Sequence, residues 1–457
     1  MFIKSRFSCL LTFYKHNHTL IVLSSIAFFF FSQLSEAKYS GGTGELNNPY
    51  QIATTNDLIS LGESTEDYDK HFILTVDIDL DPNLTGGRIF TQAIIAPDTN
   101  DISNHFQGIP FTGVFDGNGH TISNLTIEGK GYLGLFGKLE DSGANISGVG
   151  ANISNLTLDK VDINGTENYV GGLVGYNDVL GSISNCCSKG MIIGNEDVGG
   201  LVGYNYIGFI SNCYSHCTVN GDNRIGGLVG NNNYGGGISD CSSRGIVIGD
   251  EDVGGLVGYS FTSRIFNSYS SCKVTGSENV GGLIGYNGFT TIISNNYIIG
   301  TVTGDQNVGG LAGYNYVGTI SNSYSSSIVI GNEDVGGLVG ETQFGTITTS
   351  YSTGNVSGNK DTGGLVGYKG YFSEVTMSFW DIETSGLTSS DGGIGKTTIE
   401  MKQQSNFINW DFVNVWDIGE KQTYPYLRTY SLADLNKDNI INFHDLSILA
   451  ENWMEEK

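Results

Sequence analysis

Residues 434–445, DLNKDNIINFHD, carry oxygen-bearing side chains at the spacing of a calcium-binding loop. A hard cation of calcium's size takes about six to eight oxygen ligands, drawn from loop positions 1, 3, 5, 7, 9 and 12. Asn439 stands where such a loop turns sharply, and Asn tolerates the left-handed backbone better than any residue but Gly. The predicted ligands are Asp434, Asn436, Asp438, Ile440 through its carbonyl, Asn442 and Asp445. The alternative is an acidic loop that caps the helix expected after it.

A second set of carboxylates recurs earlier in the chain as Glu-Asp pairs. The set consists of Glu196-Asp197, Glu251-Asp252 and Glu333-Asp334, with Asp222, Glu278 and Asp361 at or near the same place. Such groups can chelate calcium or form the carboxylate pair of a polysaccharide-cleaving site. They return at a regular interval, however, whereas a catalytic constellation breaks a pattern at one place. We therefore interpret them as a solvated acidic corner that keeps the protein soluble.

Two common hydrolase motifs are absent from the sequence. There is no H-E-x-x-H among the seven histidines and no G-x-S-x-G nucleophile elbow. A polysaccharide lyase would place Arg or Lys beside clustered carboxylates, and the chain offers Arg224, Arg244 and Arg264. We expect no catalytic residues and a protein that is not an enzyme. The alternative is a polysaccharide lyase or hydrolase built on a β-helix scaffold.

The elements that carry these residues follow from an internal repeat. The pattern G-G-L-[VIA]-G occurs eight times at intervals of 27 or 28 residues, and the stretch NEDVGGLVG occurs twice, at 195–203 and 332–340. A period of this length is typical of a solenoid, in which each unit buries its apolar surface against its neighbours. Short runs of Val, Ile, Tyr and Thr broken by Gly and Asn indicate strands. The repeat predicts an all-β, right-handed parallel β-helix (β-solenoid) of 27–28-residue coils.

Equivalent positions of successive coils should stack at the strand spacing of a parallel sheet, about 4.8 Å. One predicted core column is Ile192, Val219, Val247, Val274, Val302, Val329 and Val356. Two residues after it each coil has Gly, and we expect a corner there with positive φ or a tight bend. Leu173 and Val174 follow each other and both are apolar, so a strict alternation admits only one of them to the core, while a bulge at the Gly pair admits both.

Cysteine and tyrosine also follow the repeat. After Cys9, the cysteines are Cys186, Cys187, Cys213, Cys217, Cys241 and Cys272, and small residues stand at several of these places in other coils. We expect them to pack in the core, with disulfides as the alternative, since stacked Cβ atoms would lie slightly farther apart than a bridge allows. A tyrosine column consists of Tyr176, Tyr204, Tyr259, Tyr286, Tyr314 and Tyr368. We expect a packed ladder, with sugar binding by ring faces as the alternative.

The eight copies of the motif resemble the GLUG-motif repeat proteins, a family of bacterial extracellular β-solenoids, over about residues 122–370. The resemblance implies an N-terminal capping segment at 38–110, a solenoid at 111–370 and a closing segment at 371–430. Residues 431–457 resemble one half of a dockerin, although dockerins normally have two such segments. That resemblance implies a small helical calcium-binding segment and a cohesin-like partner; a calcium-stabilised tag or anchor is the alternative.

Residues 1–37 indicate where the protein is located. Basic residues, the apolar run TLIVLSSIAFFFFS and the small residues of SEA are typical of a secretory signal peptide, with an uncleaved anchor as the alternative. No later segment is apolar enough to span a membrane. The net charge of −25 repels nucleic acid. We therefore expect a secreted, extracellular or cell-surface solenoid for adhesion, with an extracellular glycan or protein ligand and calcium as the one cofactor.

Overall fold

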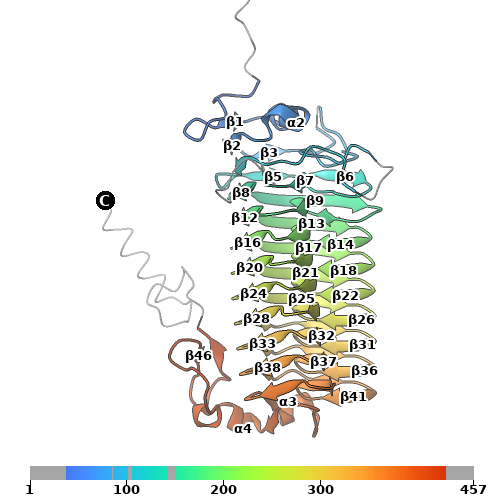
Figure 1. Cartoon of the computed structure of the whole chain (residues 1–457), viewed down its shortest axis with the longest axis vertical. Coiled ribbons are helices and arrows are strands. Elements are labelled where there is room, and N and C mark those ends of the chain that lie inside the picture. Colours follow the sequence, from blue (N-terminus) through green and yellow to red (C-terminus); the bar gives the residue numbers. More distant parts are fainter. Residues whose placement is uncertain (1–37, 85, 101–104, 142–149, 429–457) are drawn as a thin grey trace, which may run out of the picture.

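A computed structural model describes residues 38–84, 86–100, 105–141 and 150–428, and the structural statements below refer to this part of the chain. Its strands wind into a stack of coils, and each strand pairs in parallel with the equivalent strand of the coils before and after it (Figure 1). The all-β parallel β-solenoid is thereby confirmed, with about eight coils in its regular part. The signal peptide expected at 1–37 and the calcium-binding segment expected at 431–457 lie outside the described residues.

Four parallel sheets run along the stack, and the chain visits them in the order sheet I, II, III, IV in each coil. Sheet I contains β1 (Tyr50–Ile52), β2 (His71–Leu74), β4 (Val114–Asp116), β8 (Asn152–Ser154), β12 (Ser182–Ser184), β16 (Phe209–Ser211), β20 (Gly237–Ser239), β24 (Arg264–Phe266), β28 (Ile292–Ser294), β33 (Thr319–Ser321), β38 (Thr346–Thr348) and β43 (Glu374–Thr376). Sheet II contains β3 (Ile78–Asp79), β5 (Thr121–Ser123), β6 (Thr126–Gly129), β9 (Thr157–Gly165), β13 (Cys187–Ile193), β17 (Tyr214–Asn220), β21 (Ser242–Ile248), β25 (Tyr269–Thr275), β29 (Tyr297–Ile298), β30 (Thr301–Thr303), β34 (Tyr324–Ser325), β35 (Ile328–Ile330), β39 (Tyr351–Ser352), β40 (Val356–Ser357), β44 (Phe379–Asp381) and β45 (Ile394–Lys396).

Sheets III and IV hold the two halves of the repeated motif. Sheet III contains β10 (Val170–Gly171), β14 (Glu196–Gly199), β18 (Asn223–Gly226), β22 (Glu251–Gly254), β26 (Glu278–Gly281), β31 (Gln306–Gly309), β36 (Glu333–Gly336) and β41 (Lys360–Gly363). Sheet IV contains β7 (Phe136–Leu139), β11 (Val174–Asn177), β15 (Val202–Tyr206), β19 (Val229–Asn233), β23 (Val257–Phe261), β27 (Ile284–Gly288), β32 (Ala312–Tyr316), β37 (Val339–Gln343) and β42 (Val366–Lys369).

The core column predicted from the repeat is confirmed by the strand register of sheet II. Ile192 pairs with Val219, Val219 with Val247, and the pairing continues without a slip to Val356. These side chains are buried, so each coil rests its β-branched residue on the next.

Of the two alternatives expected for the glycines two residues after this column, the structure shows the bend: they turn the chain from sheet II into sheet III without positive φ. None of the seven glycines from Gly194 to Gly358 at this position has a positive φ. Gly276 shows the reason for glycine here. A Cβ on it would lie 2.8 Å from Val253 Cγ2 and 2.9 Å from Val280 Cγ2, so the stacked valines of sheet III exclude any side chain.

The Leu-Val pair left open by the sequence is buried as a pair. Leu201 and Val202 are both inaccessible to solvent, and so are Leu173 and Val174. The chain bends at Gly200 and Leu201, between β14 and β15, and this bend breaks the alternation of a straight strand. The six described cysteines are free and buried, which confirms core packing over disulfides.

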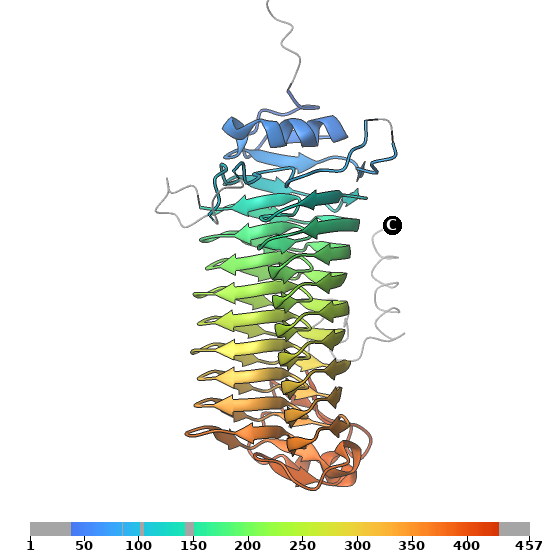
Figure 2. The ribbon, with the colours of Figure 1, turned by 90° about the vertical axis from the view of Figure 1, so that its right-hand side faces the viewer.

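Helical segments lie at the two ends of the stack (Figure 2). At the N-terminal end, α2 (Thr55–Glu63) begins with a capping box between Thr54 and Asp57, and η1 (Thr65–Asp67) follows it. At the other end lie α3 (Ile382–Ser385), α4 (Thr398–Met401), η2 (Gln404–Asn406) and the antiparallel pair β46 (Trp416–Asp417) and β47 (Tyr426–Leu427). Trp416 and Trp410 pack there against Tyr351, the last ring of a tyrosine stack on sheet II.

Candidate binding face

Sheet IV carries the tyrosine column, and its rings pack against one another in two short runs, Tyr176 with Tyr204, and Tyr259 with Tyr286 and Tyr314. Tyr176 and Tyr204 stack with ring centroids 4.8 Å apart, and Tyr259 and Tyr286 stack at 4.9 Å. Tyr286 and Tyr314 meet edge to face at 5.2 Å, and Asn231 and Glu341 interrupt the column. Within each stacked pair the facing ring surfaces are therefore not available to a sugar. Burial raises the pKa of Tyr204 to about 12, so its hydroxyl is protonated at neutral pH, where it accepts a hydrogen bond from Asn233 Nδ2 at 3.1 Å.

A second set of rings, which we name the aromatic row, lies next to this column where sheet IV turns toward sheet I. Each of seven consecutive coils contributes one ring: Tyr206, Tyr234, Phe261, Phe289, Tyr316, Phe344 and Phe372. Neighbouring centroids are 5.3 Å apart for Tyr206 and Tyr234 and 5.6 Å apart for Phe261 and Phe289. At the other end, Phe344 and Phe372 lie 5.9 Å apart.

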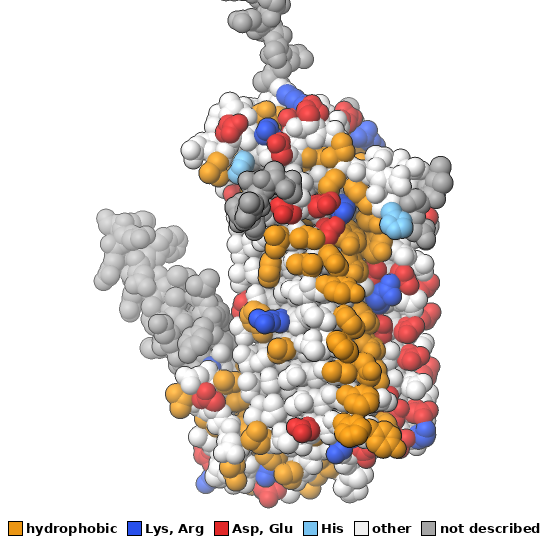
Figure 3. Space-filling model, viewed as in Figure 1, with side chains coloured by type: hydrophobic (Ala, Val, Ile, Leu, Met, Phe, Trp, Pro, Cys, Tyr) orange, Lys and Arg blue, Asp and Glu red, His pale blue; other side chains and the backbone are white. Residues whose placement is uncertain are grey.

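The aromatic row is more accessible to solvent than most of the tyrosine column: four of its rings are exposed, while Tyr206, Phe261 and Tyr316 are partly accessible, as most of the column tyrosines are. Tyr234 is 53% exposed, Phe289 is 48% exposed and Phe344 is 46% exposed. Figure 3 shows hydrophobic side chains gathered in a band parallel to the long axis, with acidic side chains along the neighbouring edge of the molecule. Soluble proteins seldom expose a continuous apolar band unless it binds a partner or ligand.

The sequence interpretation missed this row, because its rings do not occupy one repeat position. Tyr206, Phe261 and Tyr316 end their strands, whereas Tyr234, Phe289 and Phe344 stand one residue later, in the turn. The signal was nevertheless present, since each of these coils has an aromatic residue two to four positions after the place of the tyrosine column.

Buried asparagines fix the turn on which the aromatic row stands. Asn177 Nδ2 donates to Asn205 Oδ1 at 2.7 Å, and Asn205 Nδ2 donates to Asn232 Oδ1 at 2.7 Å. Asn205 Nδ2 also donates to the Gly208 carbonyl at 3.0 Å, across the turn. A second run joins Asn287 Nδ2 to Asn315 Oδ1 at 2.6 Å. Because Tyr206 and Tyr316 directly follow Asn205 and Asn315, this ladder holds the rings in register from coil to coil.

The acidic corner lies along sheet III, and the expectation that it is solvated is wrong for three of its nine residues. In each pair the Glu is at least partly accessible, but Asp197, Asp252 and Asp334 are buried. The Asp position has positive φ in every coil from β14 to β41, between 46° and 56°. That conformation favours Asp and Asn over most residues, and it breaks the alternation so that Asp and the following Val are both buried.

Partners from the next coil satisfy two of these buried carboxylates. Asp197 accepts from Arg224 Nε at 2.5 Å and from Asn231 Nδ2 at 2.8 Å. Asp252 accepts from Asn279 Nδ2 at 2.9 Å. Burial raises the pKa of Asp252 to about 7, with the charges of Glu251 and Glu278 adding to the effect. Burial likewise raises the pKa of Asp334 to about 6.

The three arginines considered for a lyase do not come together. Arg224 lies in β18 on sheet III, Arg244 in β21 on sheet II and Arg264 in β24 on sheet I. Arg224 is also paired, through the bond to Asp197 and an ion pair of 3.0 Å to Glu196. The predicted calcium ligands from Asp434 to Asp445 lie outside the described residues.

The GLUG motif matches residues 166–193, 304–330 and 331–357, which are coils of this stack. The chain carries GLUG repeats. Halomucin of Haloquadratum walsbyi is 33% identical over 168 residues, which are 35% of this chain and 2% of halomucin. A protein of Evansella cellulosilytica named as a Gly-rich membrane protein is 33% identical over 151 residues, which are 32% of this chain and 15% of that protein.

The chain spans only a small part of the length of either relative. Among solved structures, a proposed immunoglobulin A1 protease from Bacteroides ovatus is 18% identical, with a TM-score of 0.43. The alignment covers 86% of this chain and 96% of that one. A likeness this weak carries no argument about function. Within the described residues, no helix has the length and apolar character needed to cross a membrane.

Proposed function

We propose that this protein is a secreted or cell-surface β-solenoid that binds an extracellular polysaccharide along the aromatic row. The observation that carries the proposal is the row itself, one exposed or partly exposed ring per coil over seven coils. Rings at regular intervals along a rigid axis suit an extended chain of repeating units, because each unit meets the same surface. Aromatic faces and edges bind the apolar faces of sugars, while hydroxyl and amide groups nearby bind their hydroxyls.

The charge of the molecule selects among polysaccharides. The acidic edge runs beside the aromatic row (Figure 3), and the whole chain has a net charge of −25. A polyanion such as polygalacturonate is repelled by this surface. We therefore assign a neutral or cationic polymer as the ligand.

Binding without cleavage is the activity we assign. The buried carboxylates of sheet III recur with the coil, and Arg224, Arg244 and Arg264 lie on three different sheets. A lyase or hydrolase needs a unique constellation in which carboxylates and a cation face one substrate. Chain cleavage by a β-helix enzyme stays the alternative function.

Attachment is assigned to the C-terminal segment. The ligand spacing of Asp434, Asn436, Asp438, Ile440, Asn442 and Asp445 supports a calcium-stabilised module there. Its partner in this proposal is a cohesin-like protein on the cell surface or in a larger assembly. The names of halomucin and of the Gly-rich membrane protein, to which this chain is similar over about a third of its length, support a location outside the cell or at its surface.

The proposal is tested by incubating the purified full chain with insoluble cellulose, chitin, xylan and mannan, and with polygalacturonate as the acidic comparison. Bound protein and the chain length of each polymer are measured together, first with calcium and then with a chelator. We expect retention on at least one neutral polymer, none on polygalacturonate, and no shortening. Shortening of any polymer would contradict the proposal and favour the enzyme.

A further inference from the structure

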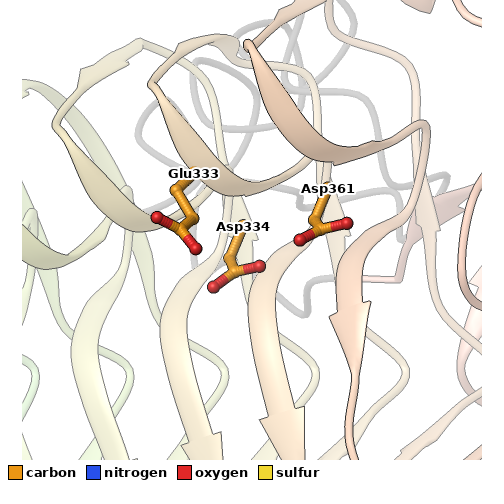
Figure 4. A group of neighbouring side chains, drawn as sticks. All are labelled: Glu333, Asp334 and Asp361. Atoms are coloured by element: carbon orange, nitrogen blue, oxygen red, sulfur yellow. The ribbon is translucent and has the colours of Figure 1, made fainter.

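Three carboxylates approach one another on the last two strands of sheet III. Glu333 and Asp334 belong to β36, and Asp361 belongs to β41, the next coil. One oxygen from each of the three lies within 4.8 Å of the others. Figure 4 shows the Asp334 carboxylate between those of Glu333 and Asp361.

Asp334 is the exception among the buried aspartates of this edge. It is 7% exposed, yet within the described residues its carboxylate has neither a hydrogen-bond donor nor an ion pair. The equivalent Asp252 receives the amide of Asn279 from the next coil, and Asp197 receives Arg224 and Asn231. A largely buried carboxylate without a donor is costly to ionise, so a bound cation would stabilise Asp334.

The sequence change responsible is at position 361. Where the coil after Asp252 offers Asn279, the coil after Asp334 offers Asp361, a second acid at the same repeat position. The NH2 donor of the amide is thus replaced by a second acceptor oxygen. The cluster faces outward at Asp361, which is exposed, and inward at Asp334.

Nearby charges do not neutralise the cluster. Lys360 Nζ forms an ion pair with Glu333 and lies 3.7 Å from Asp361 Oδ2, and its side chain is largely exposed. One cation therefore faces three carboxylates. Glu341, which is nearly buried on the same coil as Asp334, adds a fourth negative charge that acts on Asp334.

We propose that Glu333, Asp334 and Asp361 bind a calcium ion that joins the last two coils of the regular stack. Oxygen ligands without nitrogen or sulfur suit a hard cation rather than zinc. Calcium accepts flexible carboxylates together with waters, whereas magnesium demands a nearly ideal octahedron, and the exposed side of Asp361 leaves room for waters. This site is separate from the predicted loop at 434–445 and from the polysaccharide proposal.

The test needs a full chain in which the C-terminal loop no longer contributes. We choose the Asp434→Ala/Asp438→Ala variant as background and add Asp334→Asn to it. Asn already stands at this repeat position in Asn279 and Asn307, also with positive φ, so the substitution is compatible with the fold. Asp252→Asn in the same background is the matched control, because it changes a buried aspartate that has its donor.

Calcium is titrated into each protein by calorimetry, and melting temperatures are recorded with and without calcium. We expect the background and the control to bind one calcium and to melt at a higher temperature when it is present. The Asp334→Asn protein should bind calcium at least tenfold more weakly and lose most of the calcium-dependent rise in melting temperature. Without calcium, it should melt no lower than the background protein. A background protein that binds no calcium at millimolar concentrations, or an Asp334→Asn protein with unchanged affinity, would overturn the proposal.

Discussion

Asn279 donates its side-chain amide to Asp252 across one coil step, at 2.9 Å, and Asn307 donates in turn to Asn279 at 2.8 Å. Asp252 is thereby a buried carboxylate held by a neutral donor. The sequence shows it only as half of an acidic pair. Its burial predicts a pH dependence of stability that a solvated carboxylate would not have.

The folded-state pKa of Asp252 is about 7, against a usual value of 3.8, because burial disfavours the charged form and Glu251 and Glu278 add to the effect, opposed by Arg224 and the Asn279 amide. The folded state therefore binds this proton more tightly than the unfolded state does. Its contribution is present below about pH 4 and is lost as the pH rises to about 7.

Replacing Asp252 with Asn removes this loss and keeps the acceptor oxygen for Asn279. We expect the free energy of unfolding at pH 8 to rise by up to about 4 kcal/mol, since the two pKa values differ by about 3 units and each unit corresponds to about 1.4 kcal/mol. At pH 4 the variant and the wild type should melt alike. Melting curves at pH 4 and pH 8 measure the difference, and Glu374→Gln, at an exposed position, is the control. An equal gain at pH 4 and pH 8 would contradict the assigned cause.

The asparagine ladder should contribute to stability more than its number of residues suggests. Truncating Asn205 to Ala removes both the acceptor of Asn177 and the donors to Asn232 and Gly208. We expect the free energy of unfolding to fall by about 2 to 4 kcal/mol, because buried polar groups are left without partners. Chemical denaturation measures the free energy of unfolding, and Ser271→Ala, at an exposed position of sheet II, is the control. A loss as small as that of the control would mean that water replaces the amide.

Packing against the stacked valines explains why glycine stands at the bend between sheets II and III, and an alanine substitution at Gly276 tests this explanation. Gly276→Ala would bring a methyl group against the stacked side chains of Val253 and Val280. We therefore expect the free energy of unfolding to fall by about 1 to 3 kcal/mol. Gly237 is the control, because the same register position holds Phe209 and Arg264 in neighbouring coils. If Gly276→Ala melts like Gly237→Ala, the corner tolerates a side chain and the packing explanation fails.

The regular part of the fold was predictable because a solenoid stacks equivalent residues. The 27–28-residue period therefore gives the register from Ile192 to Val356 directly. Burial of the free cysteines followed from the small residues that replace Cys213 and Cys241 in other coils. A period says nothing, however, about which way a corner residue points.

The parts that were not predicted depend on backbone conformation at the corners. Positive φ at Asp252 buries a carboxylate that composition places on the surface. The aromatic row was missed for a related reason. Tyr206 and Phe289 come from different positions of their coils and become neighbours of one surface only through the turn. The donor missing at Asp334 likewise becomes visible only when successive coils are compared in space.

The central claim is that the aromatic row binds the polymer. Retention on the insoluble polysaccharide that binds the wild type best is measured for Phe289→Ala/Phe344→Ala and for Phe266→Ala, whose ring is 39% exposed on sheet I. The row predicts at least a tenfold loss of affinity for the double variant, wild-type affinity for Phe266→Ala, and unchanged melting temperatures for both. Wild-type affinity in the double variant would contradict the claim.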